Sequence, residues 1–167
     1  DLSSLKSVLS TGSPLVSEQY DWVYSNVKSN VLLSSISGGT DILGCFLGGS
    51  PILPVHRGEI QCAQLGMDVQ SWNETGESII GESGELVCVK PFPSMPIHFW
   101  NDESNQKYTS AYFEKFKNVW THGDYVEITE NGGAIISGRS DTTLNPGGVR
   151  IGTAEIYRSV ENISEIS

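Results

Sequence analysis

The chain has 167 residues, of which 38% are hydrophobic and 18% charged, and its formal net charge is −10 at pH 7. This length is typical of about one domain with a buried core. The negative charge argues against nucleic acid or an anionic membrane surface as the main partner, because both attract clustered Lys and Arg. It leaves a nucleotide possible, since helix N-termini, glycine-rich backbone and a few local arginines bind phosphate even in an acidic protein.

The cysteines indicate neither a disulfide framework nor a zinc site. Cys45, Cys62 and Cys88 are widely spaced and form no Cys-x-x-Cys pair, so buried, reduced thiols are the expected state. The sequence shows no signal-like start, and no apolar run approaches the roughly 20 residues that cross a bilayer. We therefore expect a cytosolic protein without a membrane span.

The first 50 residues predict part of an α/β layer. A short apolar run at 7–10 predicts a strand, Ser17 is a candidate N-cap of a helix with apolar residues at three- and four-residue spacing, and 31–36 has the pattern of a buried strand. A glycine-rich loop follows. In such layers, ligands bind beyond the carboxyl ends of the strands.

From about residue 51 the pattern changes to short β-rich runs separated by turns. Strands are predicted at 58–63, 67–72, 85–89, 125–129 and 134–137. One helix, predicted at 109–116, interrupts them, and a loop after residue 139 leads to a helix that begins near Thr153. This pattern predicts a small β-barrel or sandwich, so the fold class is α/β with a β-rich, barrel-like subdomain.

The glycine-rich loop is Ser37-Gly38-Gly39-Thr40-Asp41. Paired glycines allow close approach of a ligand, a threonine hydroxyl binds a phosphate oxygen, and a carboxylate holds a divalent cation between phosphates. A glycine turn followed by an aspartate that caps a helix explains the same residues, and both interpretations remain open.

Two further loops carry polar groups, namely His122-Gly123-Asp124-Tyr125 and, one hairpin later, Gly138-Arg139-Ser140-Asp141. A carboxylate accepts two vicinal hydroxyls, as in ribose binding, and a nearby arginine bridges ribose and phosphate. Each motif alone is also ordinary turn chemistry. A lone histidine such as His122 is more typical of a structural role, and the same holds for His56 and His98.

The order and spacing of these segments resemble the adenylate-forming superfamily of acyl-CoA synthetases, luciferases and peptide-synthetase adenylation domains. The series begins with Gly12-Ser13-Pro14 and continues through 37–41, Gly84-Glu85-Leu86-Val87, 123–124 and 138–155. Longer stretches, at 65–72, 84–96, 98–102 and 138–157, resemble the acetoacetyl-CoA synthetase branch.

The resemblance implies roles for the nucleotide loops. Gly12-Ser13-Pro14 would line the adenine pocket, although the acetate-activating pattern has Glu at the middle position. Gly38 and Gly39 would lie against the ligand, and Gly38 aligns with a tryptophan that shortens the acyl pocket of acetate-specific relatives. Thr40 would bind the α-phosphate. Asp41 would bind Mg²⁺, where most of the superfamily has Glu.

The later motifs acquire roles in the same way. Asp124 would hold both ribose hydroxyls and Arg139 would contact ribose and phosphate. Asp141 would be the hinge about which a small C-terminal domain rotates. Arg150 would lie near the nucleotide and the CoA entrance, and Gly148 beside the pantetheine path.

The resemblance also implies a division of the chain and an activity. Residues 1–50 would end the α/β subdomain, 51–139 would form the β-rich subdomain, and 140–167 would hold the hinge and the start of the C-terminal domain. The implied enzyme is a cytosolic acid–thiol ligase of lipid and ketone-body metabolism. It would use acetoacetate, ATP, Mg²⁺ and CoA.

The superfamily's phosphate loop and catalytic lysine are not in this sequence, so the chain alone is expected to be inactive. Two alternatives are an inactive synthetase-like regulatory or nucleotide-binding protein and a synthetase for another short acid.

Overall fold

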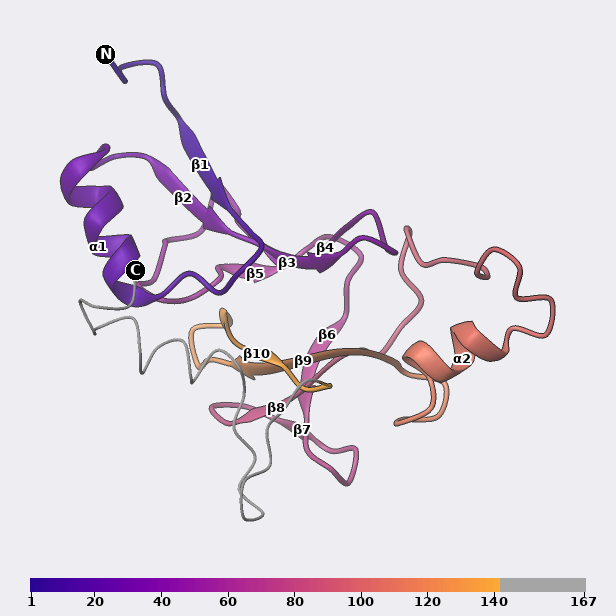
Figure 1. Cartoon of the computed structure of the whole chain (residues 1–167). Helices are drawn as coiled ribbons and strands as arrows, with labels where there is room; N and C mark the ends of the chain where they lie inside the picture. Colours follow the sequence, from indigo (N-terminus) through magenta and orange to yellow (C-terminus); the bar gives the residue numbers. More distant parts are fainter. Residues whose placement is uncertain (142–167) are drawn as a thin grey trace, which may run out of the picture.

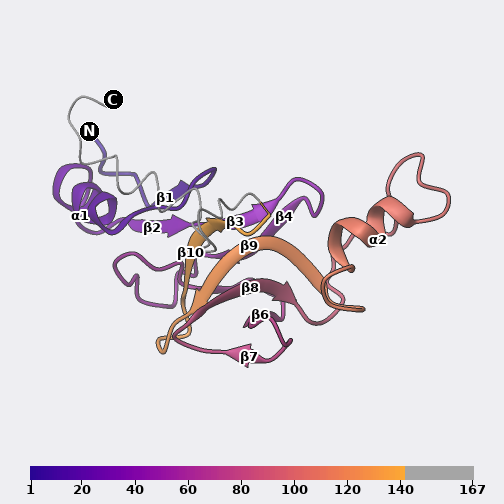
Figure 2. The ribbon, with the colours of Figure 1, turned by 60° about the horizontal axis from the view of Figure 1, so that its bottom comes forward.

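The computed structural model describes residues 1–141. The helix predicted near Thr153 lies outside the described residues. The described part contains two helices and three separate sheets, in which the strand orders are β1-β2, β3-β4-β5 and β10-β9-β8-β6-β7. α1 and the β1-β2 sheet lie at one end and α2 at the other (Figures 1 and 2). No helix within residues 1–141 has the length and apolar character needed to cross a bilayer.

A strand–helix–strand unit begins the chain, as predicted. β1 (Ser7–Ser10) and β2 (Leu32–Ser35) pair in parallel, and α1 (Ser17–Asn26) connects them. The N-cap is Val16 rather than the predicted Ser17, because Val16 is extended and its N–H is accepted by the side chain of Gln19 at 3.2 Å. Tyr20 anchors the helix, since it is buried and its hydroxyl donates to the Glu59 carbonyl at 2.8 Å.

The predicted glycine-rich loop starts with a strand. β3 (Ser37–Gly39) pairs antiparallel with β4 (Gly44–Gly48), which pairs in turn with β5 (Cys62–Ala63). Only residues 40–43 form the connecting turn, closed by a hydrogen bond from the Leu43 N–H to the Thr40 carbonyl at 3.1 Å. Sequence pattern missed β3 because glycine is depleted in strands.

The largest sheet is antiparallel. Its strands are β6 (Val69–Trp72), β7 (Ser78–Ile79), β8 (Ser83–Cys88), β9 (Trp120–Ile128) and β10 (Ala134–Arg139). β9 is the long arched strand between β8 and β10 in Figure 2. The α/β class with a β-rich part is confirmed. Within residues 1–141 the sheet does not close into a barrel, because β7 and β10 remain edge strands.

α2 (Gln106–Tyr112) starts earlier and ends earlier than the predicted helix at 109–116. Its start is fixed from a distance by Asp102, whose carboxylate accepts the N–H of Lys107 at 3.2 Å and of Tyr108 at 2.9 Å. Carboxylates satisfy otherwise unpaired N–H groups at helix N-termini. The helix therefore begins at Gln106, next to the N–H groups that the Asp102 carboxylate accepts, and not at the predicted residue 109.

The aromatic core is centred on Trp120, at the start of β9. Tyr112 stacks on its ring at 3.7 Å between centroids, and the rings of Phe92 and Phe113 meet it edge-on at 5.3 and 5.9 Å. The core cluster contains Ile42, Phe46, Leu47, Ile60, Leu86, Cys88, Phe92, Tyr108, Trp120, Val126 and Ala134. This cluster joins α2 and the β3-β4 hairpin to the large sheet.

Replacing the central tryptophan should destabilise the protein strongly. Trp120 is 2% exposed, and Trp120→Ala is expected to lower the free energy of unfolding by about 3–5 kcal/mol, as for other buried aromatic residues. Trp100 is 88% exposed, so the control Trp100→Ala should change it by less than about 0.5 kcal/mol. Urea unfolding measures both. Equal effects would contradict the placement of the core.

Candidate functional site

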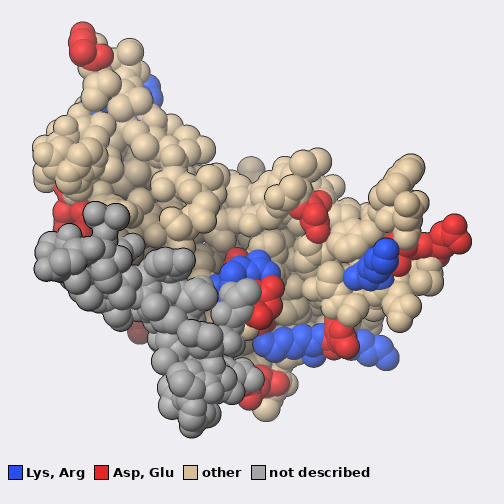
Figure 3. All heavy atoms as spheres, viewed as in Figure 1, with Lys and Arg blue, Asp and Glu red and all other residues tan. Residues whose placement is uncertain are grey.

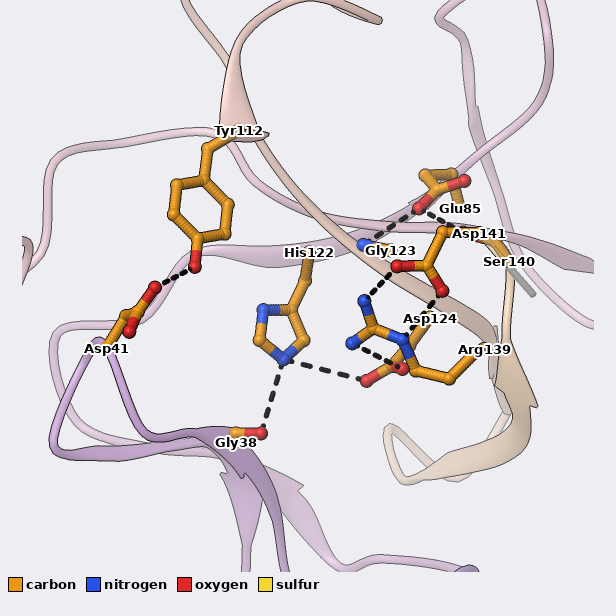
Figure 4. Close-up of polar contacts among 10 residues, drawn as sticks. All are labelled: Gly38, Asp41, Glu85, Tyr112, His122, Gly123, Asp124, Arg139, Ser140 and Asp141. Carbon is orange, nitrogen blue, oxygen red and sulfur yellow. Dashed lines mark hydrogen bonds and ion pairs between the residues drawn. The ribbon is translucent and has the colours of Figure 1, made fainter. Parts of the chain in front are cut away.

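The pairing of β9 with β10 brings two predicted site residues face to face. Asp124 and Arg139 are direct partners in the antiparallel register. The Arg139 Nη1 lies 3.4 Å from the Asp124 Oδ1. Figure 4 shows both side chains on one side of His122, with Asp41 and Tyr112 on the other. Asp124 on β9 and Arg139 on β10, 15 residues apart in sequence, thus form the centre of one polar cluster.

Arg139 is held by a fork-shaped contact with Asp141. Its Nε donates to the Asp141 Oδ1 at 2.9 Å, and its Nη2 donates to Oδ2. The guanidinium lowers the pKa of the Asp141 carboxyl, and Asp141 raises the pKa of Arg139. Forked arginine–carboxylate pairs fix orientation as well as charge. Asp141, the predicted hinge, therefore orients the guanidinium of Arg139.

Within residues 1–141, Asp124 is a buried carboxylate whose polar neighbours are Arg139 and His122. Its side chain is 11% exposed, and it lies beside the Arg139 guanidinium and the imidazole of His122, whose Nε2 is 3.6 Å from the Asp124 Oδ2. Burial raises its pKa, against the opposing effects of His122 and Arg139. Buried carboxylates are normally well paired. Asp124 therefore retains capacity to accept hydrogen bonds from a ligand.

Gly123 lies in a bulge of β9 and gives the cluster its shape. The β8–β9 register passes from Glu85↔Tyr125 to Val87↔Thr121, so that β9 carries extra residues here. Gly123 has a φ of +82°, which favours glycine. A Cβ at this position would lie 2.8 Å from the Arg139 Nη2. Bulges redirect side chains next to active sites, and this one directs Asp124 toward Arg139.

His122 connects the aspartate to the glycine-rich hairpin. Its Nε2 is 3.2 Å from the Gly38 carbonyl oxygen, and its ring meets Phe46 edge-on at 4.8 Å. The side chain is buried, and among the described residues its Nδ1 has no hydrogen-bond partner. Burial lowers the pKa of His122 despite the nearby Asp124 carboxylate. At pH 7 a neutral imidazole therefore connects β9 with the β3-β4 hairpin.

The β3-β4 hairpin changes the expectation for Gly38. A Cβ on Gly38 would lie 2.1 Å from the Gly44 carbonyl oxygen and 2.5 Å from the Cys45 Cα. Because Gly38 aligns with a tryptophan of acetate-specific relatives, a side chain at this position was expected to enter the acyl pocket. In the structure, a Cβ on Gly38 would instead point into the backbone of β4. Gly39, the last residue of β3, pairs with Gly44.

Thr40 and Asp41 lie in the exposed turn of this hairpin. The Asp41 carboxylate accepts a hydrogen bond from the hydroxyl of Tyr112, which reaches it from the end of α2. This contact orients the carboxylate. No group of three potential metal-ligating side chains occurs within residues 1–141.

Gly12, Ser13 and Pro14 follow β1. Because β1 and β2 are parallel, this loop and the start of β3 leave the small sheet at the same edge. A cavity of about 540 Å³ lies beside Pro14; it is also lined by Tyr20, Ser35, Gly58, Ile60 and Ile136. Ile136 is on β10, the strand that ends at Arg139. The cavity therefore extends from the predicted adenine loop to the strand of the polar cluster.

The two remaining predicted residues, Gly148 and Arg150, lie outside the described residues. The sequence indicated no role for Glu85 and only a structural one for His122. In the structure Glu85 accepts a hydrogen bond from the Gly123 N–H, and His122 lies within hydrogen-bonding distance of the Gly38 carbonyl oxygen. A signal for Glu85 existed in the sequence, because a carboxylate inside an otherwise apolar strand is unusual.

Basic side chains form no continuous surface on the face in Figure 3, where they lie in small groups beside acidic ones.

The lowered pKa of His122 predicts a pH-dependent stability. Below about pH 6.5 the unfolded chain binds a proton at this residue before the folded chain does, so the free energy of unfolding should fall as the pH falls. His122→Gln should flatten this dependence between about pH 7.5 and about pH 5. Urea unfolding across this range measures it. The exposed His98 provides the control, since His98→Gln should keep the original slope; identical slopes for all three proteins would contradict the prediction.

No protein-family model matches the chain. Among curated proteins, it is 58% identical to the acetoacetyl-CoA synthetase of Xenopus tropicalis, over 99% of this chain and 25% of that protein. It is also 58% identical to the acetoacetyl-coenzyme A synthetase of Rhizobium meliloti (strain 1021), over 100% of this chain and 26% of that protein.

Solved structures give the same result. Acetoacetyl-CoA synthetase from Streptomyces lividans matches 96% of this chain and 25% of its own, with a TM-score of 0.84 and 45% identity. The anthranilate CoA ligase AuaEII, in complex with anthranoyl-AMP, shares the fold at 21% identity, with a TM-score of 0.74 over 98% of this chain and 30% of its own. The chain thus spans about a quarter of the length of its curated relatives, and over that span it is similar to acetoacetyl-CoA synthetases.

Proposed function

We propose that a protein carrying this segment ligates acetoacetate to CoA in an ATP-dependent reaction. In the first step the acetoacetate carboxylate attacks the α-phosphorus of ATP, and pyrophosphate leaves. In the second step the thiol sulfur of CoA attacks the acyl carbon, AMP leaves and the thiol proton is released. Support comes from the 58% identity to synthetases with this name and from the cluster around Asp124.

The observation that carries the proposal is the under-partnered carboxylate of Asp124. Two vicinal ribose hydroxyls can donate to its two oxygens, and Arg139, 3.4 Å away, is placed to contact ribose and phosphate. Hydrogen bonds to a charged acceptor are stronger than those between neutral groups. In this scheme the ligand supplies the partners that the folded chain leaves out.

The remaining nucleotide contacts are proposed for the hairpin and the β1 loop. Adenine would lie in the cavity beside Pro14, whose volume of about 540 Å³ is in the usual range of ligand pockets. Gly12 and Ser13 would continue this wall. Thr40, at the exposed turn, would bind the α-phosphate. Gly38 and Gly39 would present backbone close to the ligand.

The environment of Asp41 fits a magnesium ion. Mg²⁺ is commonly held by one or two carboxylates together with substrate phosphates and water. Asp41 is exposed and its carboxylate is oriented by Tyr112, so one well-placed carboxylate is available. Magnesium would supply charge neutralisation for the leaving pyrophosphate, and the part of Asp41 would be to hold it beside Thr40.

The other assignments follow the same scheme. Asp141 is proposed as the domain hinge, Arg150 as a second arginine near the nucleotide and Gly148 as part of the CoA path. The proposed compartment is the cytosol, and the proposed metabolic setting is lipid and fatty acid metabolism, including the use of ketone bodies.

Loss of the Asp124 charge should weaken nucleotide binding. In a full-length protein that carries the segment, Asp124→Asn should raise KM for ATP about 10–100-fold, because a hydrogen bond to a charged group contributes about 1.5–3 kcal/mol. KM for acetoacetate should change little. The assay is acetoacetate-dependent ATP–pyrophosphate exchange.

Glu127→Gln on the same strand is the matched control and should leave both constants unchanged. Absence of any exchange by the unsubstituted protein would favour a regulatory, nucleotide-binding role. Faster exchange with another short acid would change the substrate assignment.

The hinge assignment separates the two half-reactions. Asp141→Pro removes the carboxylate that orients Arg139 and also fixes φ near −65°, so if the fixed conformer is the adenylating one, its pyrophosphate exchange should equal that of Asp141→Ala. Thioester formation should then fall by about 100-fold or more, since domain rotation precedes CoA attack. The two steps are assayed separately.

Asp141→Ala is the control for the loss of the contact with Arg139, because it removes the carboxylate without fixing φ. A parallel loss of both half-reactions in the two variants would show that Asp141 serves only to orient the arginine.

A further inference from the structure

Glu85 is a charged residue inside the large sheet that the proposed reaction does not use. It lies in β8, and only 3% of its surface is exposed. Its neighbours across the sheet are Trp72 on β6 and Tyr125 on β9. Removing a carboxylate from water is costly unless its oxygens are paired. The partners of Glu85 therefore indicate what it does.

The carboxylate accepts hydrogen bonds from three separate segments. Its Oε1 accepts from the Gly123 N–H at 3.1 Å and from the Ser140 hydroxyl at 2.8 Å, and its Oε2 accepts from the Lys115 ammonium at 2.6 Å. In Figure 4, Glu85 lies beside Gly123 and Ser140, on the sheet side of the polar cluster. One buried group thus connects β8, the bulge of β9, the end of β10 and the chain after α2.

The two backbone segments that it holds are those that carry the nucleotide residues. Gly123 directly precedes Asp124, and Ser140 lies between Arg139 and Asp141. The bulge removes the Gly123 N–H from the regular ladder, and Glu85 satisfies it. A further hydrogen bond, from the Ser140 N–H to the Gly123 carbonyl at 2.8 Å, joins the same two segments.

We propose that Glu85 is a positioning residue of the nucleotide site, which clamps Gly123 to Ser140 and thereby sets the relation of Asp124 to Arg139. This inference rests on the proposed function. Glu85 touches neither Asp124 nor Arg139 by any hydrogen bond in the described residues, so it acts through the backbone on either side of them. Lys115, on the exposed side, offsets the charge of the carboxylate.

A purely structural role would not require a carboxylate. An apolar residue of similar length could fill a buried position in β8 without a desolvation cost, and replacing buried ionic groups by apolar ones is often neutral or stabilising. A carboxylate is needed where a bulge N–H and a hydroxyl must be held at one point.

The test compares Glu85→Gln and Glu85→Met with the control Glu82→Gln in a full-length protein that carries the segment. Glu82 is an exposed carboxylate just before β8. The readouts are the Kd for AMP by titration calorimetry, KM for ATP, KM for acetoacetate, kcat and Tm. Partial unfolding lowers the active fraction and hence kcat, but it leaves the Kd of the folded fraction unchanged.

Glu85→Met should raise the Kd for AMP and KM for ATP about tenfold or more, with KM for acetoacetate within about twofold. Glu85→Gln should have a smaller effect, because its amide oxygen still accepts from Gly123. Ser140→Ala, which removes one of the three contacts, should raise the Kd for AMP about threefold, and it carries the test should the Glu85 variants fail to fold.

An unchanged Kd for AMP in these variants, with or without a lower Tm, overturns the positioning role. If the unsubstituted protein binds no AMP, the proposed function itself fails, and the inference fails with it. Weakened AMP binding in Glu85→Met and Ser140→Ala, with Glu82→Gln unchanged, supports both.

Discussion

The antiparallel register of β9 with β10 is the constraint on which the rest of the site depends. It sets Asp124 opposite Arg139, and the same strand begins at Trp120, around which the aromatic rings of α2 and the β3-β4 hairpin pack. The core and the polar cluster therefore lie at the start and in the middle of one strand. The hairpin reaches the cluster through His122, which lies between the two.

Much of this arrangement could be predicted from residue types. Asp124 and Arg139 were interpreted as a possible pair because a carboxylate at a strand and an arginine one hairpin later suit ribose and phosphate, whereas Asp141 received its hinge role from the family resemblance alone. The apolar runs also predicted β1, β2, β6, β8 and β10 to within a few residues. These signals succeed where local pattern and tertiary packing agree.

The misses have identifiable causes. β3 is made of Ser37 and two glycines, and glycine pattern indicates a loop. The start of α2 depends on Asp102, a residue outside the helix. The contacts of Glu85 depend on a bulge, which changes register without a distinctive sequence. The contacts of Glu85 with Gly123 and Ser140 are 38 and 55 residues apart in sequence, whereas β3 and α2 depend on partners close in sequence whose effect residue propensities do not include.

The hairpin at Gly38 has a consequence for how ligand preference in this segment can evolve. The space above the Gly38 Cα is filled by the main chain of Gly44 and Cys45, and the other side of Gly38 presents its carbonyl oxygen to His122. Main-chain atoms are the same whatever residue is encoded. A side chain at position 38, such as the tryptophan with which this glycine aligns, therefore requires the β4 backbone to shift.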